Sequence, residues 1–204
     1  MTPSPPLQVR LRTRLWMRVA AFGLLLAVPA IPATGAAAER TGRTITASAV
    51  SGARFFNDDL DLDTDISFGA RVAMGLDPRW GMTMDFLASH PSRKTTGDVN
   101  PIDALRILAR GNILTGRFRP YLMAGLGGIL FFFNDARDGA EGAMTFAGGA
   151  DYRFGSRTLL FVEGSTDIYR TSPVVYSPTG VPLSTGDRKT EHLAALSIGM
   201  GVEF

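Results

Sequence analysis

The sequence has no cysteine and only two histidines among its 204 residues. Without cysteine the chain forms no disulfide and carries no lipid on an N-terminal cysteine, which fits an exported protein that does not depend on disulfides. A phosphate-binding glycine loop, paired Cys and His metal ligands, and a basic patch with interleaved aromatic side chains are also missing. Beyond residue 38, no apolar run reaches the roughly 18 residues of a spanning helix. These absences argue against a nucleotide-binding enzyme, a nucleic-acid-binding protein and a helical membrane protein.

The first 38 residues have the order of parts of an export signal. An apolar run from Val19 to Ile31 follows four arginines, Arg10, Arg12, Arg14 and Arg18. Small residues come next and end at Ala36-Ala37-Ala38, an A-x-A cleavage site. The sequence therefore predicts a cleaved signal peptide at 1–38 and a mature domain at 39–204. No Arg-Arg pair is present, so the twin-arginine export route is not supported.

The predicted export signal also accounts for the basic character of the whole chain. All 19 acidic residues but only 17 of the 21 basic residues lie after residue 38, which gives the mature domain a net charge of −2. The basic excess therefore does not indicate a nucleic-acid partner.

The mature domain consists of segments in which apolar and polar or small residues alternate. This period of two is typical of β-strands. It is weakest in the first segment and clearest in the second and the last. The predicted strands are Thr44–Phe55, Ile66–Leu76, Trp80–Ser89, Ile102–Leu114, Pro120–Phe132, Met144–Phe154, Leu159–Tyr169 and about Glu191–Phe204.

The connections between these strands alternate in length. Residues 77–79, 115–119 and 155–158 are short and rich in turn-forming residues, whereas 56–65, 90–101, 133–143 and 170–189 are longer. Long external loops and short periplasmic turns are typical of outer-membrane barrels, and an even number of strands puts both ends in the periplasm. The sequence predicts an all-β fold, an eight-stranded antiparallel up-and-down transmembrane β-barrel.

A soluble β-sandwich or a lipocalin-like barrel is the alternative architecture, since it would bury the apolar face. Two features argue against it: the polar face is rich in glycine and alanine, and aromatic residues gather near the strand ends. Such aromatic belts are expected at the two membrane interfaces. They comprise Trp80, Tyr121, Tyr152 and Phe154 near the short turns and Phe55, Phe132 and Tyr169 near the long loops.

The end of the chain resembles the C-terminal assembly signal of bacterial outer-membrane barrels. In that signal a polar residue, a glycine, a hydrophobic residue and a terminal aromatic residue recur at fixed places. Here these places are filled by Ser197, Gly199, Val202 and Phe204. The resemblance implies that the outer-membrane assembly machinery reads this strand, with Phe204 the residue to test.

The mature chain as a whole resembles the OmpA-like family of small eight-stranded outer-membrane barrels. The resemblance is carried, in the right order, by Phe56–Asp63 ahead of Phe68–Arg71, by Asp77–Gly81, by Arg119–Tyr121 before Ala124–Gly127, and by Ala150–Phe154. Some members continue into a peptidoglycan-binding domain, and we expect none after Phe204.

Charged residues occupy the polar face of the predicted strands and would point into the lumen. An eight-stranded barrel is just wide enough for its side chains to fill it, and buried charges are costly unless paired. We favour a plug of salt bridges over a gate whose pairs exchange partners to pass small ions. The predicted lumen charge network is Arg71, Asp85, Arg106, Arg110, Asp151, Arg153, Glu163, Asp167 and Glu203.

Two further groups of residues are candidate sites. Asp59, Asp61 and Asp63 begin like a calcium loop, but Thr64 and Ala70 replace the glycine and glutamate that an EF-hand needs. They remain a weak divalent candidate in an otherwise solvated acidic loop.

The second group is His90 and Ser92. Their positions in the alternation of the third strand place both side chains on the lipid side. They resemble the His and Ser of lipid A hydrolases in the outer membrane. Pro91 lies between them, no acidic partner can be placed, and His192 belongs to a strand that does not neighbour theirs. A catalytic triad cannot be assembled from these residues.

The sequence thus predicts a non-enzymatic protein of the cell outer membrane with a structural or surface-interaction role and no cofactor. The alternatives are a narrow pore for small solutes or ions, a lipid A-modifying enzyme, and adhesion through the loop at 170–189. The Pro and Ser/Thr content of this loop is typical of a flexible segment. We expect a monomer whose partners are outer-membrane lipid and lipopolysaccharide, periplasmic chaperones and the assembly machinery, with no nucleic acid.

Overall fold

The computed structural model describes residues 44–57, 60, 62–94, 97, 99–132, 139–171, 174–176, 182–185 and 189–204. The chain divides into two units, Met1–Glu39 and Arg40–Phe204, and every described residue belongs to the second. The predicted signal peptide at 1–38 lies outside the described residues. In the part of the chain that is described, no helix is long and apolar enough to cross a membrane.

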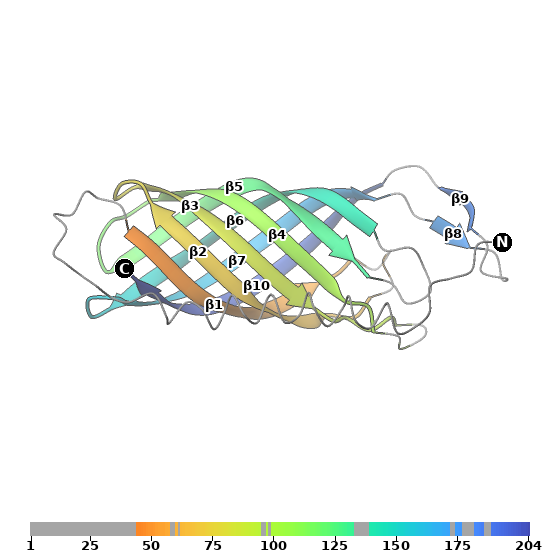
Figure 1. The fold of residues 1–204 in the computed structure, drawn as a ribbon, viewed down its shortest axis with the longest axis horizontal. Helices are drawn as coiled ribbons and strands as arrows, with labels where there is room; N and C mark the ends of the chain where they lie inside the picture. The colour runs from red at the N-terminus through yellow and green to blue at the C-terminus, as the bar shows by residue number, and fades with distance from the viewer. Residues whose placement is uncertain are drawn as a thin grey trace. The chain divides into compact units, whose positions relative to one another are not determined.

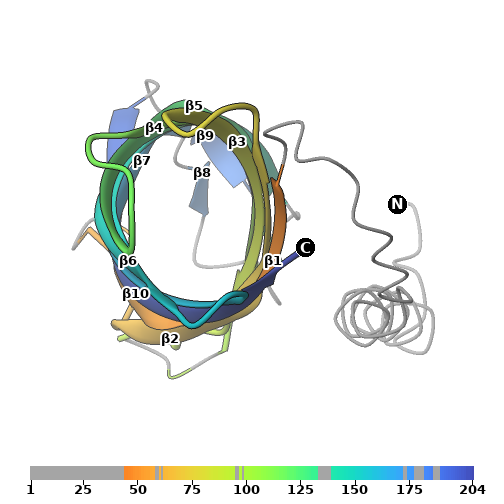
Figure 2. The ribbon, with the colours of Figure 1, turned by 90° about the vertical axis from the view of Figure 1, so that its left-hand side faces the viewer.

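Eight strands close into a barrel in which all neighbours are antiparallel (Figures 1 and 2). Around the barrel the order is β1-β10-β7-β6-β5-β4-β3-β2, so each strand pairs with its predecessor in the barrel and the last pairs with the first. This confirms the predicted fold class. The barrel strands are β1 (Thr44–Phe55), β2 (Asp65–Gly75), β3 (Trp80–Ser89), β4 (Ile102–Asn112), β5 (Phe118–Phe131), β6 (Gly139–Phe154), β7 (Thr158–Thr171) and β10 (Lys189–Glu203).

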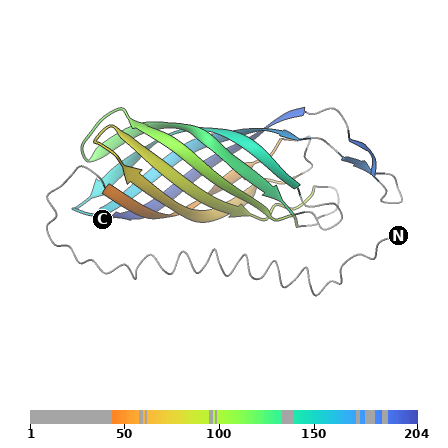
Figure 3. The same ribbon diagram turned by 45° about the horizontal axis from the view of Figure 1, so that its top comes forward.

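Two short strands outside the barrel were not predicted. β8 (Val174–Tyr176) and β9 (Pro182–Thr185) form a separate antiparallel sheet within the long connection from β7 to β10. Strands of three and four residues are too short to produce a recognisable alternation. In Figure 3 this small sheet lies beyond the end of the barrel from which β7 and β10 extend.

The strand bounds agree with the prediction for β1 and β3 and differ at the ends of the others. The largest difference is in β6, which begins at Gly139 rather than Met144. Its first residues lack alternation, yet they pair in register with Ile129, Leu130 and Phe131 of β5. The hydrogen bonds between β5 and β6 therefore continue past the stretch in which apolar and polar side chains alternate.

In every barrel strand the outward face is mainly apolar, whereas the inward face holds the buried polar and charged side chains together with some apolar ones. In β10, Leu196, Ile198 and Met200 are exposed, while Ser197 is buried and Glu203 is largely so. The same division holds in β2, where Phe68 is 61% exposed and Arg71 is 4% exposed. An apolar outer face and an inner face that carries charged side chains suit a barrel surrounded by lipid.

The predicted aromatic belts are correct in part. Trp80, Tyr152 and Phe154 near the short turns and Phe55 near the long loops are exposed on the outer face. Phe132 follows the end of β5 and is half-buried.

Tyr121 and Tyr169 were wrongly placed in these belts, because both are buried inside the barrel. Tyr121 precedes the outward Leu122, and Tyr169 follows the outward Ile168 by one residue. Strand parity, rather than closeness to a strand end, decides the face to which a side chain points.

Candidate functional site: the charged lumen

The barrel has two ends, which differ in the length of the connections between strands. We call the end with the short connections after β2, β4 and β6 the turn end, and the opposite end, with the long connections, the loop end. The first residue of β1 and the last residue of β10 lie at the turn end, where the backbone amide of Phe204 donates to the carbonyl of Ile45 at 2.8 Å.

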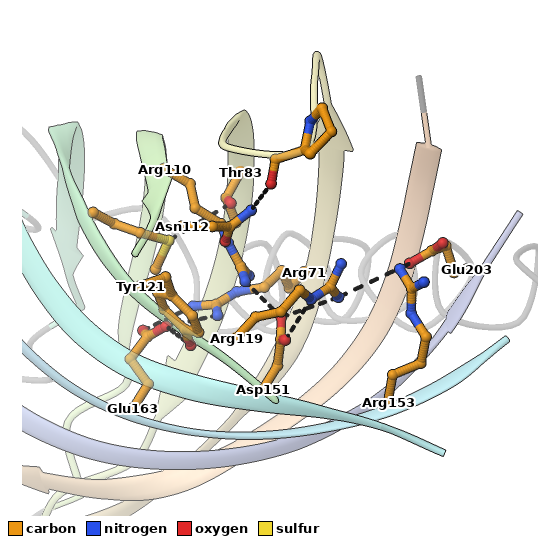
Figure 4. Close-up of polar contacts among 12 residues, drawn as sticks. Arg71, Thr83, Arg110, Asn112, Arg119, Tyr121, Asp151, Arg153, Glu163 and Glu203 are labelled. Atoms are coloured by element: carbon orange, nitrogen blue, oxygen red, sulfur yellow. Dashed lines mark hydrogen bonds and ion pairs between the residues drawn. The ribbon is translucent and has the colours of Figure 1, made fainter. Parts of the chain in front are cut away.

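Arg71 of β2 is the centre of the largest buried cluster (Figure 4). Its Nε and Nη2 donate to both carboxylate oxygens of Asp85 on β3 at 2.8 and 2.7 Å. Its Nη1 and Nη2 donate to Glu163 across the lumen on β7 at 2.7 and 2.8 Å. The hydroxyl of Tyr121 donates to Glu163 at 2.8 Å, and the guanidinium lies 4.7 Å from the ring centre of Phe161. Bidentate pairs of this kind are among the strongest charged hydrogen bonds.

Arg106 of β4 and Asp167 of β7 form a second buried pair nearer the loop end. The Nη2 atom of Arg106 donates to Asp167 at 2.7 Å, and both side chains are at most 3% exposed. Thr145 of β6 donates to the other carboxylate oxygen at 2.6 Å, and Ser165 accepts from Arg106 at 3.4 Å. Asp167 is thereby compensated by one cation and one hydroxyl.

A third cluster lies at the turn end and is more open to water. Asp151 of β6 accepts from Arg110 of β4 at 2.5 Å and from Arg119 of β5 at 2.8 Å. Arg153 donates to Glu203 at 2.5 Å, and an Arg119 nitrogen lies 3.9 Å from the same carboxylate (Figure 4). The nine residues predicted for the lumen network therefore all lie on the inner face and are joined by these contacts.

Arg119 was not predicted as part of the lumen, because the sequence pattern places it in the turn between the fourth and fifth strands. In the structure it is the second residue of β5, paired in register with Asp151. β5 starts two residues before the alternation of apolar and polar residues becomes recognisable. The sequence pattern therefore does not reveal that Arg119 belongs to the strand.

Arg54 of β1 is the second residue that sequence reasoning missed, and it is 0% exposed. Its Nη1 donates to the Ser89 hydroxyl at 3.1 Å and to the Ile102 carbonyl at 3.5 Å. Its Nε and Nη2 have no hydrogen-bond partner among the described residues. The signal that could have identified it is parity, since Thr46, Ser48, Val50, Gly52 and Arg54 share one face of β1.

Apolar side chains fill the lumen at the loop end. This apolar cap consists of Leu62, Ile102, Ala104, Ile129, Phe131, Ala143, Tyr169 and Leu193, with Phe56 and Leu60 packed against it. Leu62 comes from the connection between β1 and β2 and forms an isolated bridge with Arg93 in the next long connection. Asn57, which also follows β1, donates to the buried Glu191 of β10 at 2.9 Å. The first loop therefore folds back over the barrel mouth.

The remaining predicted residues belong to the weak divalent candidate and to the assembly signal. Asp59 and Asp61 are outside the described residues, so the weak divalent candidate is not tested at these positions. Among the described residues there is no group of three or more His, Cys, Asp or Glu side chains placed to hold a metal ion. Of the four residues of the predicted assembly signal, Ser197 and Gly199 face the lumen, and Val202 and Phe204 face outward.

His90 and Ser92 lie in the long connection that follows β3. His90 is exposed and its backbone amide donates to the carboxylate of Asp65, while Ser92 forms a backbone bridge with Val99. His192 is exposed on β10, which does not neighbour β3 in the barrel.

Comparisons with known proteins agree with this architecture. The family model described as "Outer membrane protein beta-barrel domain" matches residues 20–204. Neisserial surface protein A is 15% identical, with 80% of this chain and 98% of that chain covered and a TM-score of 0.53. OprG from Pseudomonas aeruginosa is 15% identical, with coverages of 79% and 95% and a TM-score of 0.55. At these identities the likeness is one of fold. A comparison with curated protein sequences gave no match.

Proposed function

Because the chain belongs to the outer membrane protein beta-barrel family, we propose that it is a non-enzymatic, non-conducting barrel with a structural or surface-interaction role. In this proposal residues 1–38 are a signal peptide that is removed during export. One of the fold neighbours is named a surface protein, which is the role proposed here. Intact-mass measurement of the protein purified from outer membranes tests the cleavage, with a chain beginning at Glu39 as the expected product.

The side chains that cross the lumen are the observation that carries the proposal. Between the two ends, Arg71 bridges Asp85 and Glu163 from three different strands, so side chains cross the lumen at mid-height. Above this level the apolar cap fills the loop end. A conducting path would have to break buried ion pairs, each of which costs several kcal/mol when one partner is left unpaired. An enzyme is not supported either, since both histidines are exposed, and His90 follows β3 whereas His192 lies on β10, which does not neighbour β3.

Conductance across planar bilayers tests the proposal against the pore alternative. Refolded mature protein should leave the bilayer silent, because paired charges and the apolar cap leave no continuous aqueous path. A double variant, Leu62→Gly with Glu163→Gln, removes part of the cap and unpairs Arg71, and it should conduct if the closure arises from these groups. Discrete channels in the wild-type protein that change when Arg106 or Glu163 is neutralised would instead support the pore.

A further inference from the structure

A groove on the outer face of the barrel is not explained by the closed lumen. It encloses about 1040 Å³, crosses β3, β4, β5, β6 and β7, and reaches Ala195 of β10. Its side chains include Trp80, Leu122 and Phe146, which are exposed on the outer face. The inward residues that it reaches, such as Met123 and Ala147, are chain neighbours of these outward ones. The groove therefore opens to the lipid and not to the lumen, and its volume is comparable to ligand sites of about 300–1,000 Å³.

The register of the sheet explains why the surface is hollow there. Trp80, Gly111, Leu122, Gly148 and Gly164 are paired in one row across five adjacent strands. A Cβ added to Gly148 would lie 3.2 Å from Leu122, whereas a Cβ added to Gly164 would meet nothing within 4 Å. The next row adds Ala109 and Ala124 to the floor. The floor is therefore open at Gly164, whereas the side chains of Trp80 and Leu122 lie close to Gly111 and Gly148.

The direction and length of the groove fit one leaflet of a membrane. Trp80 is the first residue of β3, at the turn end, whereas Gly164 is the seventh of the 14 residues of β7, near mid-height. Four spacings between strands span about 19 Å. Half of the hydrocarbon core is about 15 Å thick, so a groove that runs obliquely from the interface to the midplane matches the reach of an acyl chain.

The side chain of Arg79 carries a positive charge at the interfacial end of the groove. Arg79 lines it, is exposed, and forms no ion pair with the described residues. Its turn is held in place, because the Asp77 carboxylate accepts from the backbone amides of Arg79 and Trp80 at 2.7 and 2.8 Å. Asn112 adds two bonds, from its amide to the Arg79 carbonyl at 2.7 Å and from its side chain to the Pro78 carbonyl at 3.1 Å.

We propose that this groove holds one glycerophospholipid of the leaflet at the turn end, with the phosphate at Arg79 and an acyl chain over Ala124, Gly148 and Gly164. Arginine suits a phosphate because its planar guanidinium donates two parallel charged hydrogen bonds. Trp80 beside it places an amphipathic ring at the interface, where tryptophan is favoured in membrane proteins. A second copy of the barrel fits less well, since it offers an apolar face to Arg79. The inference goes beyond the proposed function and holds whether or not the lumen conducts.

Native mass spectrometry of the mature barrel, refolded in detergent and titrated with dioleoyl phosphatidylglycerol, tests the proposal. Wild-type protein should retain one lipid per barrel, and dioleoylglycerol, which lacks the phosphate, should bind at least tenfold more weakly. Gly164→Leu fills the open floor and should reduce the affinity at least tenfold, and Arg79→Gln should reduce it about tenfold, as expected for loss of a charged hydrogen-bond pair.

Two matched controls keep the test specific. Gly142 is also an exposed outward glycine with open space at its Cβ, but it lies outside the groove, so Gly142→Leu should leave binding within twofold. Arg117 accepts a backbone amide through its carbonyl as Arg79 does, at another short turn, so Arg117→Gln should behave like wild type. Equal effects of each variant and its control, or no effect of any, would show only non-specific annular lipid and overturn the proposal.

A lipid-independent dimer that Gly164→Leu abolishes would also overturn the proposal, in favour of a second copy in the groove. Heat-modifiable gel mobility verifies that each variant has folded. If Gly164→Leu does not fold, the comparison of Arg79→Gln with Arg117→Gln still tests the proposal. Arg79→Gln should fold, because the Arg79 side chain is exposed and only its backbone supports the turn.

Discussion

Arg54 and Arg71 are both buried in the lumen, but their surroundings differ. Arg71 is held by two carboxylates and lies against an aromatic ring. Arg54 has only neutral oxygens within hydrogen-bond distance, and two of its nitrogens have no partner among the described residues. A buried cation without a counter-charge costs free energy, whereas removing one partner of a buried pair leaves the other uncompensated.

The two arginines should therefore respond in opposite ways to the same substitution. Arg54→Met should increase the free energy of unfolding by about 1–3 kcal/mol, because an apolar side chain replaces a buried charge whose hydrogen bonds go only to neutral oxygens. Arg71→Met should decrease it by about 3–5 kcal/mol, because Asp85 and Glu163 lose their shared cation. Urea unfolding in lipid vesicles, followed by tryptophan fluorescence, measures both. Destabilisation by Arg54→Met would contradict this and show that the charge is compensated in the folded barrel.

Parity in the sequence was sufficient to place most of the lumen residues, such as Arg71 and Glu163, on the inner face. It could not show which of them meet, because Arg71 and Glu163 belong to strands that are separated in the barrel by β1 and β10. Arg54 was missed because the alternation of β1 is weak, and the cap residue Leu62 because a loop has no period to read. Contacts across a lumen depend on the register of all the intervening strands, which no single strand reveals.

At the scale of one element, β10 combines a packing role with the predicted assembly role. Gly199 lies where an added Cβ would be 2.3 Å from the ring of Phe161 and 2.6 Å from the Ala49 carbonyl. A larger residue there forces the ring or the backbone to move. Phe204, in contrast, is 49% exposed on the outside. Substitutions at these two positions should separate folding from recognition.

Phe204→Ala should reduce the amount of barrel inserted in cells while leaving refolding into vesicles close to wild type, because no interior packing is lost. Gly199→Val should impair both, since it overpacks the lumen by about 1–3 kcal/mol. Heat-modifiable gel mobility of membrane fractions and of refolded protein reports the two outcomes. Unimpaired insertion of Phe204→Ala in cells would remove the proposed role of this residue, although the barrel itself would stand.

The whole barrel should behave as one cooperative unit in detergent. Because every barrel strand has two hydrogen-bonded neighbours, there is no free edge at which unfolding can begin. Unheated protein should therefore run on a gel as a compact species and shift to the position of the unfolded chain after boiling. The same mobility with and without heating, together with a soluble monomer in the periplasm, would contradict a membrane barrel.

The pairing of β1 with β10 has a kinetic consequence. Thr46 pairs with Glu203, so the contact that completes the ring joins nearly opposite ends of the described chain. Closing so long a loop costs entropy before its hydrogen bonds form, and contacts of high sequence separation slow folding. Until that step, β1 and β10 each present an unpaired edge to other chains. The rate of ring closure, more than the stability of the finished barrel, therefore decides how much chain is lost to aggregation before insertion.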